Sequence, residues 1–176
     1  MNIASVPSEV REQKLEEWLK AYGDSVLRTC FVYLADRALA EDALQDTFVK
    51  VWRGMDGFEG RNASTVKTWI MRIAINTCKD YRRSAWFRHT DMSKSVEALP
   101  QVCHGMTEES RALFLEVMRL PAKYKQVILL YYFHDMTMAE AAEALGLSRS
   151  AVQHRLQKAY ALLRFQPEGS ELDEVQ

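Results

Sequence analysis

Residues 137–164 read TMAEAAEALGLSRSAVQHRLQKAYALLR, and this stretch decides the fold of the C-terminal part of the chain. Thr137 and Glu140 form a capping box, in which each side chain satisfies a free amide at a helix start. Gly146 suits the left-handed residue that ends a helix, and Ser148 suits the cap of the next one. The stretch therefore predicts a short helix, a tight turn and a longer helix to about Phe165, which is the arrangement of a helix-turn-helix.

The longer helix has two different faces. At about 100° per residue, its large apolar residues fall on one stripe, and we expect that stripe to be buried. Small, amide and basic side chains lie opposite, where they can approach DNA and bond to base edges. An ordinary helical hairpin within a bundle is the alternative. The apolar stripe comprises Val152, Leu156, Ala159 and Leu163, and the opposite face comprises Ser150, His154, Gln157, Lys158, Ala161 and Arg164, with Gln153 at the border.

The rest of the chain is also predicted to be helical, since it has only 7 Gly and 4 Pro in 176 residues and 48% apolar residues in periodic patterns. Helices are expected at about 15–34, 38–55, 65–83 and 108–119, with another beginning at Pro121. Periodicity fades from Ser84 to about Thr107. We therefore predict an all-α protein with two small helical domains, 10–84 and 108–166, joined by a flexible linker at 85–107 and followed by an acidic tail at 167–176.

The helix predicted at 65–83 also has one apolar face and one polar, basic face. Its inward stripe is Val66, Ile70, Ile73, Ala74, Thr77 and Tyr81. Arg72, Asn76, Lys79 and Arg83 form an outer ridge that can follow phosphates, and the asparagine within it can contact a base. The loop Phe58–Ser64 that precedes this helix is polar and contains glycine, so it could receive an unstacked base.

Charge is unevenly distributed along the chain. The net charge of −1 argues against nucleic-acid binding, and residues 1–60 hold eleven acidic against seven basic side chains. Residues 61–90, however, hold seven basic side chains against Asp80 alone, and Ser148–Arg164 holds four basic side chains and no acid. Two such basic blocks can bind polyanions locally. The alternative is that they are ordinary surface charges in contact with water and bind nothing.

Other functional classes find little support in the sequence. Cys30, Cys78 and Cys103 are far apart, which predicts neither a metal site nor a disulfide, and the first two are expected to pack as small hydrophobes. No catalytic spacing, P-loop or dinucleotide fingerprint is found, so we expect no enzyme activity, cofactor or small-molecule substrate. The longest apolar run, Val127–Phe133, is too short to cross a bilayer, and no signal peptide is seen. A cytoplasmic protein without membrane insertion is expected.

Three segments in order give a resemblance to a known family: AEDALQDTFVKVW at 40–52, KTWIMRIAINTCKDYRR at 67–83, and the helix-turn-helix. From about Leu15 to Arg164, without the linker, the chain resembles the extracytoplasmic-function (ECF) sigma factors of bacterial RNA polymerase. The resemblance implies binding to core RNA polymerase, recognition and melting of a promoter, and control by an anti-sigma factor. A helix-turn-helix regulator that acts without polymerase is the alternative, and it would normally dimerise.

The resemblance also assigns site residues. The first segment would dock on a helical coiled coil of the largest polymerase subunit through Asp42, Gln45, Asp46, Phe48 and Trp52, although the two aromatic residues could instead be core. The single-stranded −10 element would be bound by Phe58, Gly60, Arg61, Asn62, Arg72, Asn76, Lys79 and Arg83. The duplex −35 element would be bound by Ser148, Arg149, Ser150, Gln153, His154, Gln157 and Lys158. Family members often have Thr-Val-Lys-Ser-Arg at 151–155, where this chain has Ala-Val-Gln-His-Arg, so the resemblance does not carry a −35 sequence preference over to this chain.

Overall fold

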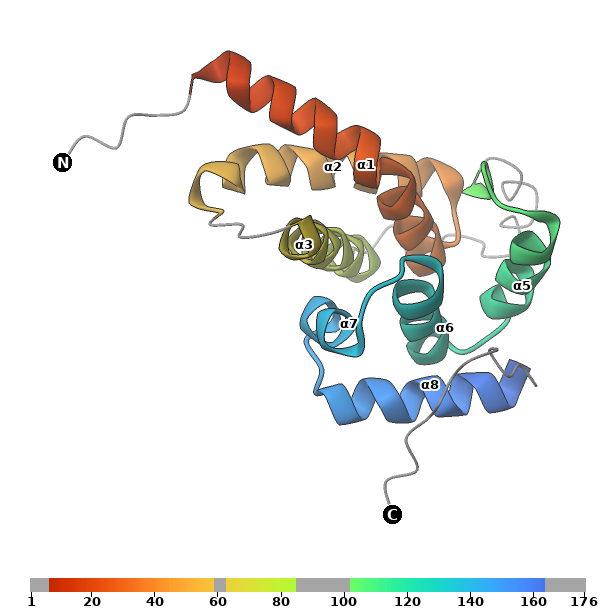
Figure 1. Cartoon of the computed structure of the whole chain (residues 1–176). Helices are drawn as coiled ribbons and strands as arrows, with labels where there is room; N and C mark the ends of the chain where they lie inside the picture. Colours follow the sequence, from red (N-terminus) through yellow and green to blue (C-terminus); the bar gives the residue numbers. More distant parts are fainter. Residues whose placement is uncertain (1–6, 59–62, 85–101, 164–176) are drawn as a thin grey trace.

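A computed structural model describes residues 7–58, 63–84 and 102–163 of the chain, and every regular element in these ranges is helical (Figure 1). This confirms the all-α prediction. The elements are α1 Ser8–Leu34, α2 Arg37–Gly54, the 3-10 turn η1 Met55–Gly57, α3 Ala63–Arg83, α5 Glu108–Met118, α6 Ala122–Ile128, the π-helical turn η4 Leu129–Phe133, α7 Met138–Leu145 and α8 Arg149–Leu163.

Helix ends in the C-terminal part follow the predicted local signals. Thr137 and Glu140 form the complete capping box at the start of α7. Gly146 ends that helix with a φ of 67° in the left-handed region, which a glycine adopts without steric cost. Ser148 Oγ accepts a hydrogen bond of 3.2 Å from the amide of Ala151 and so caps α8. The helix-turn-helix at α7–α8 is therefore built from short-range interactions.

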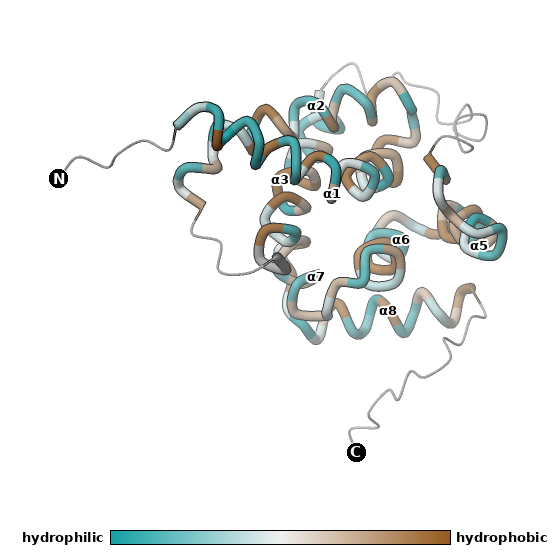
Figure 2. Tube along the Cα trace, turned by 45° about the horizontal axis from the view of Figure 1, so that its top comes forward, coloured by the Kyte–Doolittle hydropathy of each residue, from teal (hydrophilic) through white to brown (hydrophobic). Residues whose placement is uncertain are grey.

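The N-terminal module is a bundle of α1, α2 and α3. Apolar side chains fill the space between the three helices, and Figure 2 shows the hydropathy of the residues along each helix. Burial of each large apolar side chain contributes about 1.5–3 kcal/mol. Cys30 and Cys78 are fully buried here, as predicted, and the hydrogen bond between them, followed by burial, raises the pKa of the Cys30 thiol. Other fully buried members are Val26, Phe31, Leu34, Val51, Ile70 and Ala74.

The C-terminal module consists of α5 to α8. Helix α6 lies against α8, and α7 contacts both α8 and the turn η4. The π-helical turn is closed by the amide of His134, which donates to the carbonyl of Leu129 over 3.1 Å. The fully or almost fully buried core includes Phe114, Val117, Ile128, Leu129, Leu130, Ala141, Val152 and Leu156.

The two modules pack against each other, with α7 against α3 and α6 against α1 (Figures 1 and 2). Helix α3 is thus enclosed by α1, α2 and α7, so its buried face is wider than the single stripe predicted. Met71 and Ile75, outside that stripe, are fully buried. Val66, Ile73 and Tyr81, within it, are only partly buried.

The predicted linker at 85–107 differs in part from the structure. Residues 85–101 lie outside the described residues. In the part that is described, Val102 and Cys103 are buried in the core, and the amide of Met106 donates to the carbonyl of Cys103 over 3.0 Å. The apolar pair therefore belongs to the folded body. The domain boundaries themselves remain a prediction.

Candidate nucleic-acid and protein interfaces

An apolar groove of about 440 Å³ opens between α1 and α2. Leu19 and Val49, one from each helix, are both 46% exposed. Exposed large apolar side chains that gather around a groove are typical of a surface that receives a protein partner. The groove is lined by Leu15, Leu19, Leu44, Gln45, Phe48, Val49 and Trp52.

The residues predicted to bind polymerase divide between this groove and its flank. Gln45, Phe48 and Trp52 line the groove, and Phe48 is only 7% exposed, so most of its ring is core. Asp42 and Asp46 are exposed on α2, and Asp46 Oδ2 accepts a hydrogen bond of 2.7 Å from the Tyr81 hydroxyl on α3. Burial, and then this bond, raise the pKa of Tyr81, which therefore stays a donor at neutral pH.

Sequence reasoning missed Leu44 and Val49 of α2 and three contributors from α1 to the groove region. Leu15 and Leu19 bring α1 into the lining, and Arg11 stacks on Trp52 with its guanidinium 4.2 Å from the ring centroid. Arg11 also donates to the Trp52 carbonyl over 2.9 Å and pairs with Asp56 at 3.1 Å. The four-residue spacing of the leucines marks one face of a helix, but not which part of that face stays open.

The cationic ridge predicted on α3 lies on the surface. Arg72, Asn76 and Arg83 are exposed, and Lys79 is partly buried. Arg83 lies 3.7 Å from Asp80, which also pairs with Lys50 at 3.5 Å. These ion pairs are exposed and weak, so both cations can exchange Asp80 for a phosphate.

An aromatic cluster lies where the predicted −10 loop leaves the bundle. Phe58 stacks on Trp69 with ring centroids 4.5 Å apart and planes 20° apart, and Trp18 meets both rings edge-on at 6.1 Å. A Cβ added to Gly54 would lie 3.1 Å from Trp69, so glycine allows this close packing. Phe58 is thus packed against the bundle. Gly60, Arg61 and Asn62 lie outside the described residues.

The predicted −35 residues lie on one side of α8. Gln153 is partly buried, and Ser148 Oγ is already engaged by the Ala151 amide and lies 3.1 Å from Ser150 Oγ. Val152, Leu156 and Ala159 of the opposite stripe are buried, while Leu163 is only partly so. The exposed members of the −35 set are Ser148, Arg149, Ser150, His154, Gln157 and Lys158.

Comparisons with known proteins agree with this architecture. Residues 18–88 match the family described as sigma-70 region 2, and residues 110–163 match sigma-70 region 4. RNA polymerase sigma factor YlaC of Bacillus subtilis (strain 168) is 31% identical over 153 residues, which cover 82% of this chain and 87% of that protein. The ECF RNA polymerase sigma factor SigG of Mycobacterium tuberculosis (strain ATCC 25618 / H37Rv) is 25% identical over 191 residues, with 93% of this chain and 51% of that protein covered.

A solved structure shares the fold. The sigma factor RpoE of Bartonella quintana, crystallised with the anti-sigma factor NepR, superposes with a TM-score of 0.63 at 19% identity, over 89% of this chain and 98% of that one. Two family matches in the expected order, and a relative above 30% identity over most of both chains, settle the family. The chain belongs to the extracytoplasmic-function subfamily of RNA polymerase sigma factors, the initiation factors that bind core polymerase and promoter DNA.

Proposed function

We propose that this chain performs its initiation role through three separate surfaces. The α1–α2 groove docks on core polymerase, the α3 ridge binds the −10 element, and the outer face of α8 reads the −35 element. The observation that carries the proposal is that α2, α3 and α8 each bury apolar residues and leave most of the polar residues of their proposed surfaces exposed. Because core polymerase and promoter DNA are cytoplasmic, we also infer a cytoplasmic location.

The groove suits a helix of the polymerase as its occupant. An amphipathic helix can place its apolar side chains in a groove of this kind. Asp42 and Gln45 at the rim can pair with polar and basic groups beside that apolar stripe, which fixes orientation and partner choice. The exposed Leu19 and Val49 supply apolar area that the free chain leaves in contact with water.

On each of the two proposed DNA surfaces, some residues position the DNA backbone and others read its bases. Arg72 and Lys79 on α3 provide phosphate contacts along a single strand, and Asn76 between them supplies an amide for a base. On α8, Arg149 at the helix start faces phosphate, while Gln157 and Lys158 can bond to base edges in the major groove.

The closed packing of the modules bears on when DNA can be bound. The elements named −10 and −35 lie about 25 base pairs apart, or about 85 Å at about 3.4 Å per base pair. A compact chain of 176 residues has a radius of gyration of only about 16 Å. We infer that α7 must separate from α3 before both surfaces reach their elements, and that polymerase docking favours this separation.

An anti-sigma factor is the second partner that we propose. The RpoE structure contains an anti-sigma factor, and the present chain has the same fold. A protein that covers the α1–α2 groove or holds the modules together would prevent polymerase docking. The matches to both sigma-70 region 2 and sigma-70 region 4 favour the sigma-factor function over the alternative of an independent regulator.

Polymerase docking can be tested by in-vitro transcription with core polymerase on a genomic promoter library. A Leu19→Asp and Val49→Asp double variant changes two exposed side chains, so the fold should persist while capture of polymerase and transcription fall at least tenfold. Val10→Asp is the matched control, because Val10 is 51% exposed on the same helix but outside the groove. Transcription that continues unchanged in the double variant would show that the groove is not the docking surface.

A further inference from the structure

His134 of the C-terminal module is inserted against the N-terminal module. The residue is 2% exposed, and its Nε2 lies 3.1 Å from Thr29 Oγ1 on α1. Its main-chain carbonyl accepts a hydrogen bond from Lys67 Nζ on α3. One residue thus contacts two helices of the other module through polar groups, at the point where the modules meet.

The hydrogen-bond partners assign the tautomer of the neutral imidazole. Thr29 Oγ1 donates to the Ser25 carbonyl over 2.8 Å, so its oxygen accepts from Nε2–H of His134. The other ring nitrogen, Nδ1, is therefore unprotonated. It is buried and has no hydrogen-bond partner among the described residues. A proton added there would place a charge on a buried ring, which costs free energy.

The charges around the imidazole also oppose protonation. Arg28 faces it from α1 and Lys67 from α3, and both are cations. Burial, followed by these two charges, lowers the pKa of His134 to about 3, although the carbonyls of Phe133 and Ser25 act in the opposite direction.

The backbone around His134 holds it in this position. The π-helical turn η4 ends at Phe133, and Asp135 follows with a φ of 50°, a left-handed conformation that is uncommon for residues other than glycine. π-helical turns and left-handed residues are enriched at functional sites. The amide of Met136 then donates to the Leu130 carbonyl over 3.1 Å, which fixes the turn.

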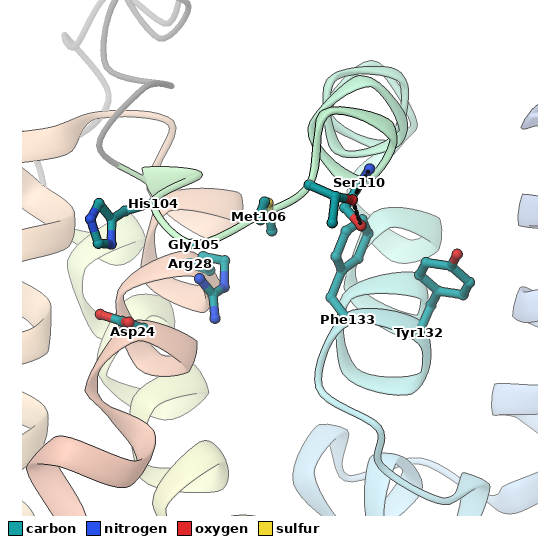
Figure 3. A pocket seen from close by; sticks show the side chains of 9 residues that line it. Asp24, Arg28, His104, Gly105, Met106, Ser110, Tyr132 and Phe133 are labelled. Carbon is teal, nitrogen blue, oxygen red and sulfur yellow. Dashed lines mark hydrogen bonds between the residues drawn. The ribbon is translucent and has the colours of Figure 1, made fainter.

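A second histidine near the module boundary has a different environment. His104 is exposed and lines an open cavity of about 360 Å³ with Asp24, Arg28, Thr107 and others (Figure 3). His104 therefore serves as a comparison for the buried site.

We propose that His134 is an acid-sensitive latch: its neutral imidazole holds the two modules together, and its protonation releases them. The latch is a property of the free chain. Only its consequence, that acid frees the DNA-reading surfaces, rests on the proposed function.

The direction and size of the effect follow from proton linkage. The open form binds the proton with the ordinary histidine pKa of 6.5, and the closed form binds it only near pH 3. The contribution of His134 to the stability of the closed form is therefore fully present above about pH 7.5. It is lost as the pH falls through 6.5 toward 3. Between pH 7.5 and 5.0, the ratio of open to closed molecules should rise about 30-fold.

The test is a pH titration of the full chain by NMR, with labelled histidine rings and methionine methyl groups and without polymerase or DNA. Met71 reports on the interface, because its Sδ lies 3.6 Å from Thr29 Oγ1. We expect His134 to protonate between pH 7 and 4 with the same midpoint as the change at Met71. Protonation of His134 without a change at Met71, or a ring still neutral at pH 4, overturns the proposal.

Small-angle scattering of variants gives an independent readout. His134→Gln keeps an N–H donor for Thr29 but cannot take up a proton, so its radius of gyration should stay the same at pH 7.5 and 5.0. His104→Gln and His154→Gln should expand in acid as the wild type does. If His134→Gln expands equally, the latch is elsewhere, and this result is independent of whether the chain docks on polymerase.

Discussion

Tyr81 of α3 donates a hydrogen bond of 2.7 Å to Asp46 of α2. The bond joins the helix that carries the proposed −10 ridge to the helix that carries the proposed polymerase-binding residues. The Asp46 carboxylate beside the groove is thereby held by α3. On the proposed assignment of the surfaces, polymerase docking would depend on the position of the ridge.

Removal of this bond should have a small effect on stability. Tyr81→Phe keeps the ring and loses only the hydroxyl, so the free energy of unfolding should fall by about 0.5–1.5 kcal/mol in a urea titration. The affinity for core polymerase, measured by fluorescence anisotropy, should change because Asp46 is no longer held. Equal affinity for both proteins would show that Asp46 is not part of the docking surface.

Substitutions along the α3 ridge should weaken promoter binding without regard to sequence. Arg72→Ala and Lys79→Ala each remove one proposed phosphate contact. The slope of log affinity against log salt concentration, measured for the holoenzyme, should therefore become less steep by about one unit for each substitution. Lys123→Ala, an exposed lysine of α6, is the control and should leave the slope unchanged. Asn76→Ala should instead relax the base preference, and a uniform loss there would argue against base contact.

Two α8 residues that depart from the family pattern should determine the −35 preference. A Gln153→Lys and His154→Ser double variant restores the residues that many ECF factors have at these positions. Selection from a randomised promoter pool should then give a different order of preferred −35 sequences. The binding free energy should change by about 1–3 kcal/mol for each contacted base pair that is replaced. An unchanged order would place the reading residues elsewhere on α8.

The aromatic cluster should stabilise the N-terminal module. Phe58→Ala removes the ring that is stacked on Trp69. Because Phe58 is only partly buried, we expect the free energy of unfolding to fall by about 1–3 kcal/mol. Denaturation monitored by tryptophan fluorescence measures this change. Phe58→Tyr retains the stacked ring and should stay close to the wild type. Promoter melting should decline in the alanine variant, since the proposed −10 loop begins at Phe58.

The free chain should bind promoter DNA weakly because its two modules are packed together. In an electrophoretic shift assay near neutral pH, we expect no sequence-specific complex at nanomolar concentrations of the free chain. Core polymerase should make the complex appear. Nanomolar, sequence-specific binding by the chain alone would contradict the closed arrangement.

Local signals in the sequence were sufficient to predict the helices, both ends of α7 and the start of α8, although α1 begins at Ser8 rather than near residue 15. The capping box of Thr137 and Glu140, the left-handed Gly146 and the cap at Ser148 all involve groups within four residues of one another. Interactions of this kind are specified by neighbouring residues, whatever the rest of the chain does. The exposed ridge on α3 and the exposed face of α8 were predictable for the same reason, because helical periodicity alone separates them from the apolar stripe.

Contacts between residues far apart in the chain decided which helix faces are buried and which side chains meet. Met71 is buried although the periodicity of α3 placed it outside the apolar stripe, because helices of both modules enclose that helix. Leu19 remains exposed although it lies on an amphipathic face, because α2 leaves a groove beside it. Thr29 and His134 are 105 positions apart, and no local pattern indicates that they meet. Sequence periodicity determines which faces of a helix can be buried, whereas the packing of the two modules determines which of them are.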